Sequence, residues 1–185
     1  MAGGGVLCAS ALGSRRAHAQ VSNAKTLATT LLRALGYDTN LRSRAGATLV
    51  LAILYRPGIV ASRHERDEMA TVFKELEAVT VQGLPLRALS IALNDTSLLE
   101  QAASTDEVSI FYVCAGLEDD ITAIKQVSRK LKIRTAGGKA SLVDNGISLA
   151  VDADVKPSMI VNLKESREEG ASFGSALLRL AKVIK

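Results

Sequence analysis

The stretch ATLVLAILYRPG, residues 47–58, contains a continuous apolar run that ends in a turn signal. A run of this length, closed by Arg-Pro-Gly, is typical of a strand that is buried on both faces of a sheet. Such strands occur in parallel sheets that helices cover on both sides. Residues 47–55 therefore favour an α/β fold.

Helical and strand patterns alternate around this run. Residues 23–35, NAKTLATTLLRAL, place leucines four positions apart before Gly36, which is typical of a helix that ends there. Ser-x-x-Glu spacings at residues 62–65 and 97–100 predict two further helix starts by the capping-box pattern. After the first strand, the expected order is helix 61–79, strand 86–93, helix 96–103, strand 108–115 and helix 118–131.

The later part of the chain predicts shorter elements. Residues 133–138, IRTAGG, predict a short strand that runs into a glycine turn, and residues 139–146 predict one or two helical turns. Residues 147–163 predict two strands that form a hairpin through residues 154–156. The neighbouring TAGGKAS, residues 135–141, is the nearest match to an anion-binding loop, but it lacks P-loop spacing and a tight turn is the simpler interpretation.

Residues 162–185 predict one closing helix whose apolar stripe packs on the sheet. The stripe consists of Phe173, Leu177, Leu180 and Ile184. Small residues between 170 and 176 leave a homodimer or partner contact open as an alternative. Together these patterns predict an α/β fold: a single domain with a mixed, mostly parallel sheet, helices on both faces, and a C-terminal hairpin plus closing helix.

Residues 1–19 are similar to a secretory signal peptide. They consist mainly of small and apolar residues, and Ala17-His18-Ala19 fits the A-x-A pattern, which predicts cleavage between Ala19 and Gln20. No Lys or Arg directly follows Met1, which a start upstream of this Met would explain. An N-terminal tail is the alternative. We therefore divide the chain into a signal peptide, residues 1–19, and one domain, residues 20–185.

Charge and hydropathy exclude some functions. Of the 23 basic residues, two lie in residues 1–19, which leaves 21 basic and 19 acidic residues alternating along the remainder. No basic run is interleaved with aromatic residues, so we expect no nucleic-acid partner. No apolar stretch reaches the roughly 18 residues of a membrane span, so we expect none in the mature chain.

The polar residues that could carry chemistry each have a simpler interpretation. Cys114 ends an apolar run and is expected to be a buried small hydrophobe. His64 is expected at the surface of a charged helix, while Asp119 and Asp120 are expected to open a helix, where free N–H groups favour carboxylates. Metal-ligand spacing and cofactor motifs are missing, so we expect no metal, no cofactor and no enzyme activity.

The carboxyl ends of parallel strands form the default crevice for a ligand. Residues from four predicted strands are expected to meet there, without an acid–base–nucleophile set, which favours recognition over turnover. They are Tyr55, Arg56, Asn94, Asp95, Ala115, Gly116, Gly137 and Gly138.

The segment IVNLKESREEGASFGSALLRLAKVI, residues 160–184, resembles the C-terminus of the YfiR-like family of exported proteins. There a strand ends in an Ile-Asn or similar pair, and a helix follows with a small-residue turn and a Leu-Leu-x-Leu-Ala ending. The similarity in element order extends over about residues 23–184. The matching positions are Asn162, Leu163, Gly170, Ser175, Leu177, Leu178, Leu180 and Ala181.

The resemblance implies a non-enzymatic regulator in the periplasm. Such a protein modulates a membrane-bound signalling protein, such as a diguanylate cyclase of cyclic-di-GMP signalling, by contact with its periplasmic domain. It adds Asn162 to the partner candidates. The alternative, which follows from the residues themselves, is a periplasmic small-ligand binding protein that uses the crevice at the strand carboxyl ends. An enzyme of flavodoxin-like or hydrolase type has the least support, because Cys114 and His64 lack evident partners.

Overall fold

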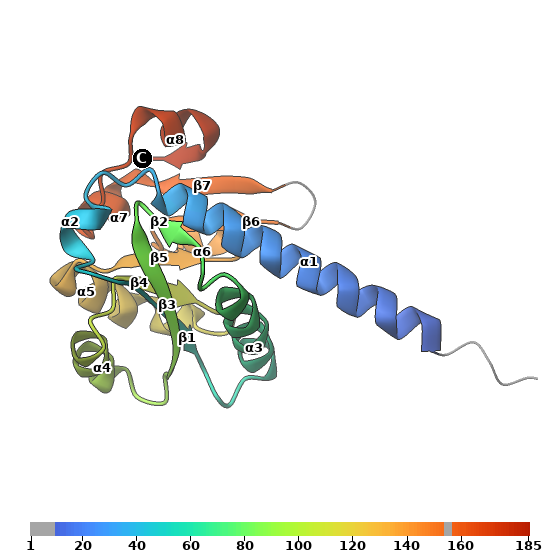
Figure 1. Cartoon of the computed structure of the whole chain (residues 1–185). Coiled ribbons are helices and arrows are strands. Elements are labelled where there is room, and N and C mark those ends of the chain that lie inside the picture. Colours follow the sequence, from blue (N-terminus) through green and yellow to red (C-terminus); the bar gives the residue numbers. More distant parts are fainter. Residues whose placement is uncertain (1–9, 154–156) are drawn as a thin grey trace, which may run out of the picture.

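One sheet of eight strands forms the centre of the molecule, in the order β2-β3-β1-β4-β5-β6-β7-β8 (Figure 1). The computed structural model describes residues 10–153 and 157–185, with side chains from residue 23 onward. The strands are β1 Leu49–Tyr55, β2 Thr80–Val81, β3 Leu84–Ala92, β4 Ile110–Val113, β5 Arg134–Gly137, β6 Leu149–Asp152, β7 Ser158–Asn162 and β8 Lys182–Ile184.

The sheet is mixed and mostly parallel. Strands β3, β1, β4, β5 and β6 run parallel to one another. β2 is antiparallel to β3, β7 is antiparallel to β6, and β8 pairs with β7 in parallel. The expected hairpin is therefore present as β6 and β7, although its predicted turn at residues 154–156 lies outside the described residues. The predicted α/β class is confirmed.

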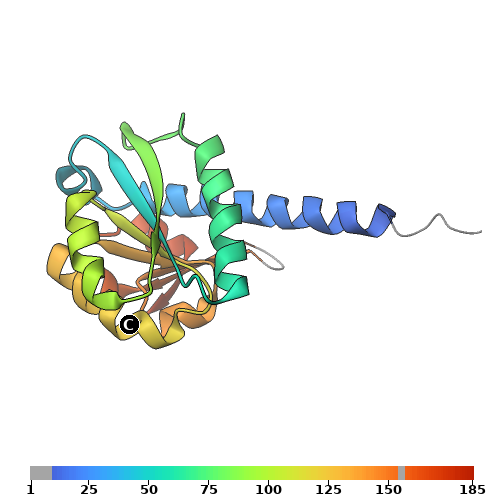
Figure 2. The ribbon, with the colours of Figure 1, turned by 90° about the horizontal axis from the view of Figure 1, so that it is seen from below.

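Helices cover both faces of the sheet (Figures 1 and 2). On one face, α1 and α3 pack against the odd-numbered residues of β1, from Leu49 to Ile53. On the other, α4, α5 and α6 pack near the even-numbered residues, from Val50 to Leu54. The helices are α1 Ser10–Leu35, α2 Leu41–Arg44, α3 Val60–Glu75, α4 Leu99–Thr105, α5 Ile121–Leu131, α6 Ala140–Asp144, α7 Leu163–Glu168 and α8 Ser175–Leu180, with 3-10 turns at η1 Thr96–Leu98 and η2 Glu118–Asp120.

β1 lies at the centre of the core, as its sequence predicts. Its first six residues are at most 2% exposed, and side chains on both faces contact a helix layer. Each fully buried Leu, Ile or Val contributes about 1.5–3 kcal/mol relative to an exposed position. The strand therefore contributes to the hydrophobic core on both faces of the sheet.

α1 ends at Leu35, directly before Gly36, which confirms the predicted stop of the opening helix. It packs against α3 and β6, and its amino-terminal turns extend past the rest of the molecule in both views (Figures 1 and 2). The predicted cleavage site between Ala19 and Gln20 lies within this helix, and the cleavage stays a prediction. Within residues 10–153 and 157–185, no helix combines the length and apolar character that a membrane span requires.

Both predicted capping boxes are wrong. α3 begins at Val60, and Ser62 Oγ accepts the Arg56 backbone N–H at 2.9 Å instead of capping the helix. At the second site, the Asp95 carboxylate accepts the Ser97 N–H at 2.8 Å, and it therefore caps η1 in place of Ser97. α3 thus begins two residues before Ser62 without a side-chain cap, and a neighbouring acid takes the capping place at η1; the Ser-x-x-Glu spacing reveals neither.

The closing segment is not one helix. α7 ends at Glu168, and Gly170 adopts a φ of 78°, which is a left-handed conformation that favours glycine. The Ala171 N–H donates to Ser166 O at 2.8 Å, and the Gly170 N–H donates to Arg167 O at 2.9 Å, as in a Schellman motif. The chain then forms α8 and the edge strand β8. As a result, Leu177 is buried but Leu180, expected on the same packed stripe, is 64% exposed.

A buried ion pair fastens the closing segment to the amino edge of the sheet. Arg134, at the start of β5, donates from Nη2 to Asp38 Oδ2 at 2.6 Å, and their side chains are 3% and 0% exposed. The other Asp38 oxygen accepts the backbone N–H groups of Ser172 and Asn40 at 2.8 and 3.0 Å. One carboxylate therefore connects the end of α1, β5 and the segment after α7.

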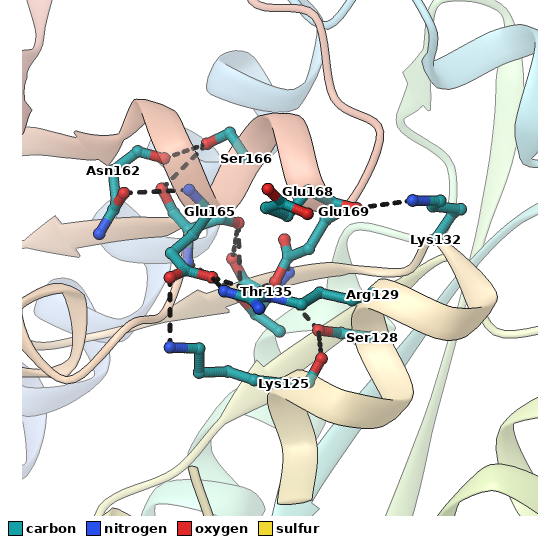
Figure 3. A network of polar contacts seen from close by, with 11 residues as sticks. Lys125, Ser128, Arg129, Lys132, Thr135, Asn162, Glu165, Ser166, Glu168 and Glu169 are labelled. Atoms are coloured by element: carbon teal, nitrogen blue, oxygen red, sulfur yellow. Dashed lines mark hydrogen bonds and ion pairs between the residues drawn. The ribbon is translucent and has the colours of Figure 1, made fainter. Parts of the chain in front are cut away.

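Two further acids on and after α7 face α5 and β5 (Figure 3). Glu165 pairs with Lys125 at 3.2 Å and Arg129 at 2.6 Å. Glu169 is fully buried, and it accepts the Thr135 hydroxyl at 2.6 Å and the Thr135 N–H at 2.9 Å. Burial raises the pKa of Glu169 to about 7, although the hydrogen bonds from Thr135 favour its charged form.

Replacing Asp38 by Asn should leave the Arg134 guanidinium buried without its counter-charge. We expect Asp38→Asn to lower the free energy of unfolding by about 3–5 kcal/mol. Urea unfolding measures the change. The matched control is Asp119→Asn, which removes the same charge from an exposed position and should change stability by about 0.5 kcal/mol or less. A loss in Asp38→Asn as small as in the control would contradict this role.

Glu169 should make stability depend on pH. Between its ordinary pKa of 4.5 and its folded value of about 7, the folded protein binds a proton that the unfolded chain has lost. The free energy of unfolding should therefore fall as pH rises through this window, by on the order of 3 kcal/mol. Urea titrations across the window should show this slope in the wild type and in Glu77→Gln, and a nearly flat profile in Glu169→Gln. An unchanged slope in Glu169→Gln would refute the assignment.

Candidate functional site

β1 and β4 are neighbours in the sheet, but the helices that follow them cover opposite faces. The connection after β1 leads through α3 to β3 on one face, and the connection after β4 leads through α5 to β5 on the other. The loops after β1 and β4 therefore diverge at the carboxyl edge. In open α/β sheets this switch point is where ligands bind.

A pocket of about 710 Å³ lies at this edge, between α1, α3 and the ends of β4, β5 and β6. Its volume falls in the range of about 300–1,000 Å³ that is typical of small-molecule sites. We call it the strand-end pocket. Its lining residues are Asn23, Ala24, Leu27, Val60, Ala61, His64, Glu65, Glu68, Met69, Tyr112, Ala115, Gly138, Lys139 and Ala153.

Glu65 is held in place by two donors. Tyr112 Oη donates to its Oε1 at 2.7 Å, and the Ala115 backbone N–H donates to its Oε2 at 2.8 Å. Tyr112 is fully buried and contacts Phe73 edge to face, with ring centroids 6.3 Å apart. Burial, together with the charge of Glu65, raises the pKa of Tyr112 well above its ordinary value, so the phenol keeps its proton and donates.

The outer part of the pocket is charged. His64 Nδ1 lies 3.5 Å from Glu68 Oε2, one helical turn further along α3. Lys139 comes from the opposite side, in the loop between β5 and α6. The walls between them are apolar, with Leu27 from α1 and Met69 from α3. The pocket therefore combines an apolar interior with a few fixed polar groups, as ligand sites commonly do.

Cys114 lies beside this site, but it is poorly suited to act as a nucleophile. It is fully buried. Burial, and next the charge of Glu65, raise the pKa of its thiol far above the ordinary range. Since the thiolate is the reactive form, the thiol should be inert in the folded protein.

Of the residues predicted for the crevice, Gly138 and Ala115 line the strand-end pocket. A Cβ on Gly138 would lie 2.8 Å from Tyr112 Oη and 2.9 Å from Leu27 Cδ1, so only glycine leaves this space open. Gly137 faces α6 instead, where a Cβ would lie 2.4 Å from Leu142 Cδ1.

The residues that follow β1 and β4 lie at the same edge, but they are engaged elsewhere. The Arg56 guanidinium pairs with Asp120 of η2, which explains this acid better than helix capping. The guanidinium carbon of Arg66 lies over the Tyr55 ring, 4.3 Å from the ring centroid. Gly116 adopts a φ of 82°, and a Cβ there would contact Ile59.

Asn94, Asp95 and Asn162 are not brought into the pocket. Asn94 and Asp95 follow β3, and the Asp95 carboxylate caps η1. Asn162 ends β7, which runs antiparallel to β6, so it lies at the opposite edge of the sheet. There its Oδ1 accepts the Glu165 N–H at 3.1 Å and caps α7.

Sequence reasoning missed most of the pocket. It assigned Glu65 to a capping box. It correctly placed His64 at the surface, where 58% of its side chain is exposed, but it did not foresee that His64 lines this pocket. The available signal is the helical period: Ala61, Glu65, Glu68 and Met69 follow one another at the spacing of a single helix face. Because Met69 on that face is buried, the two acids on it are polar groups that face inward. No group of three or more His, Cys, Asp or Glu residues in the described part of the chain could hold a metal ion.

The sequence matches no protein-family model and none of the curated proteins with which it was compared. Solved structures share its fold. One is described as "the ABC domain in complex with L-Trp from Streptococcus pneumonia", with a TM-score of 0.59, 14% identity, and coverage of 88% of this chain and 60% of that chain. Another is the open structure of CD0873, a substrate binding protein from Clostridium difficile, with a TM-score of 0.55, 13% identity, and coverage of 79% and 57%.

A third structure is a conserved domain protein from Vibrio cholerae, with a TM-score of 0.54, 12% identity, and coverage of 74% of this chain and 54% of that chain. At these identities the similarity shows the fold alone. The chain spans at most 60% of the length of these proteins.

Cys114 should resist thiol reagents until the protein unfolds. The sequence has one other cysteine, Cys8, which a Cys8→Ser substitution removes. In that background we expect slow labelling of the native protein and fast labelling in denaturant, since burial both shields the thiol and suppresses the thiolate. An added Asp119→Cys substitution supplies an exposed thiol, and it should label fast in the native state. Fast labelling of Cys114 in the folded protein would overturn the description of this residue as inert.

Proposed function

We propose that this chain binds a small organic molecule in the strand-end pocket. The observation that carries the proposal is the coincidence of position and chemistry: a pocket of ligand size lies at the switch point of a mostly parallel sheet. Its apolar walls offer area for burial, and Glu65 offers a fixed polar group. Such a combination supports binding more than turnover, because the thiol beside it is buried and inert.

The structures of similar fold support the same class of function. One is in complex with L-Trp, and another is a substrate binding protein. A small-ligand binding role therefore has more support than the regulatory role that the YfiR-like resemblance implies. That role, contact with a membrane-bound signalling protein, stays a prediction, as does export to the periplasm.

A thermal-shift screen tests the proposal with the full chain. A ligand present at 100 times its dissociation constant stabilises the folded state by about 2.7 kcal/mol. For a chain of this size that should raise the melting temperature by about 5–10 °C. A broad set of small organic acids, amines, sugars and nucleosides is the probe. If no compound raises the melting temperature, the proposal fails.

Gly138→Ala should weaken binding of any compound that the screen identifies, by about tenfold. The added Cβ forces Leu27 or Tyr112 to shift into the pocket, and overpacking of this kind costs about 1–3 kcal/mol. Isothermal titration measures the loss. The control is Gly58→Ala, whose Cβ would meet no atom within 4 Å and which should bind like the wild type. Equal affinities in both variants would place the ligand elsewhere.

A further inference from the structure

We infer that the strand-end pocket selects a ligand with a protonated amine attached to an apolar body, because two carboxylates of α3, Glu65 at its floor and Glu68 in its outer part, line it beside apolar walls. This inference rests on the proposed function and adds the chemical class of the ligand. It follows from the hydrogen-bonding capacity of Glu65, the charge next to it and the lining of the remaining walls.

Glu65 has acceptor capacity left for a ligand. A carboxylate offers about four lone-pair positions, and Tyr112 and Ala115 each occupy one. Both of these partners are donors, so they hold the carboxylate in one orientation without neutralising its charge. A further donor from a ligand completes the set, and a charged donor does so most strongly, because charge-assisted hydrogen bonds are about twice as strong as neutral ones.

Glu68 adds a second negative charge on the same face of α3. Residues three apart on a helix are neighbours, and like charges at this spacing destabilise the helix. His64 lies 3.5 Å from Glu68, which is longer than a good hydrogen bond, so it leaves room for a competing cation. A cation between the two acids would relieve their repulsion, whereas an anion would increase it.

The rest of the lining selects the body of the ligand. Leu27, Val60 and Met69 supply apolar contact area, and Gly138 keeps the space between Leu27 and Glu65 open. Burial of such a body stabilises the complex in proportion to the apolar area that it removes from water. An inorganic cation or a strongly hydrated polyol would leave this area unused.

Lys139 distinguishes two kinds of ligand that both carry a protonated amine, a simple amine and a zwitterion. A simple amine needs only Glu65 and Glu68. A zwitterion, such as an α-amino acid with an apolar side chain, would also place its carboxylate near the Lys139 ammonium on the opposite wall. The shared feature is the protonated amine, and the two cases differ in whether Lys139 contributes to affinity.

Isothermal titration near neutral pH tests the inference with four probes that share a phenyl group and differ in their polar groups. They are 2-phenylethylamine, 2-phenylethanol, 3-phenylpropanoate and L-phenylalanine. We expect 2-phenylethylamine or L-phenylalanine to bind at least about tenfold more tightly than the alcohol and the anion. Lys139→Met should weaken L-phenylalanine alone if the ligand is a zwitterion, and neither probe if it is a simple amine.

The decisive variant is Glu68→Gln, because Glu68 has no part in holding β4. It should remove the advantage of the amine over the alcohol, while Glu77→Gln, which takes the same charge from an exposed position just after α3, should keep it. Glu65→Gln should do the same as Glu68→Gln, provided that its unfolding curve shows a folded protein.

The outcomes separate the inference from the proposed function. If the alcohol binds as well as the amine, if the anion binds best, or if Glu68→Gln keeps the advantage of the amine, the amine inference is wrong and the pocket still binds ligands. If none of the four binds, the hits of the thermal-shift screen decide: cationic hits support the inference, and neutral or anionic hits overturn it. If that screen has no hits, the proposed function itself falls.

Discussion

The buried ion pair between Asp38 and Arg134 is the constraint on which the arrangement of this molecule depends. It joins residues 96 positions apart and fixes the carboxyl end of α1 against β5. Because a helix is stiff over a few turns, anchoring that end also sets where the earlier turns of α1 lie, and these provide Asn23 and Leu27 to the strand-end pocket. An interaction at the amino edge of the sheet thus positions one wall of the site at the carboxyl edge. Buried charges tolerate little displacement, since an unpaired charge in the interior costs several kcal/mol.

Glu65 has a similar organising role at the opposite edge. Its carboxylate connects α3 to the side chain of Tyr112 on β4 and to the backbone just after that strand. The same carboxylate lines a pocket of ligand size, so the group that holds the helix to the sheet would also contact a ligand bound there. The attachment of α3 to the sheet and the polar floor of the pocket therefore depend on one set of atoms. This sharing explains why the pocket has a fixed polar floor although Asn23, His64 and Lys139, which also line it, are exposed.

The sequence predicts those parts of the fold that depend on short-range patterns. The apolar run of β1 and the helical period of α5 reveal their elements directly, because burial on both faces or on one stripe leaves a regular trace. The closing segment is less predictable, because the sequence pattern groups Gly170 with small packing residues whereas the structure uses it to end α7. The site was largely missed for another reason. Its lining comes from residues as far apart in the sequence as Asn23 and Ala153. The order of the strands in the sheet brings them together, and no local sequence pattern predicts this.

The bond between Tyr112 and Glu65 has an optical consequence. The chain has no tryptophan, three tyrosines and three weakly emitting phenylalanines, so phenol rings dominate its intrinsic ultraviolet emission. One of these rings is buried and donates its hydroxyl hydrogen to a carboxylate 2.7 Å away, an arrangement that quenches an excited phenol by proton transfer. Any molecule that draws the carboxylate away from the phenol would brighten this ring. Tyrosine emission therefore reports on the state of this one hydrogen bond, with no dye attached.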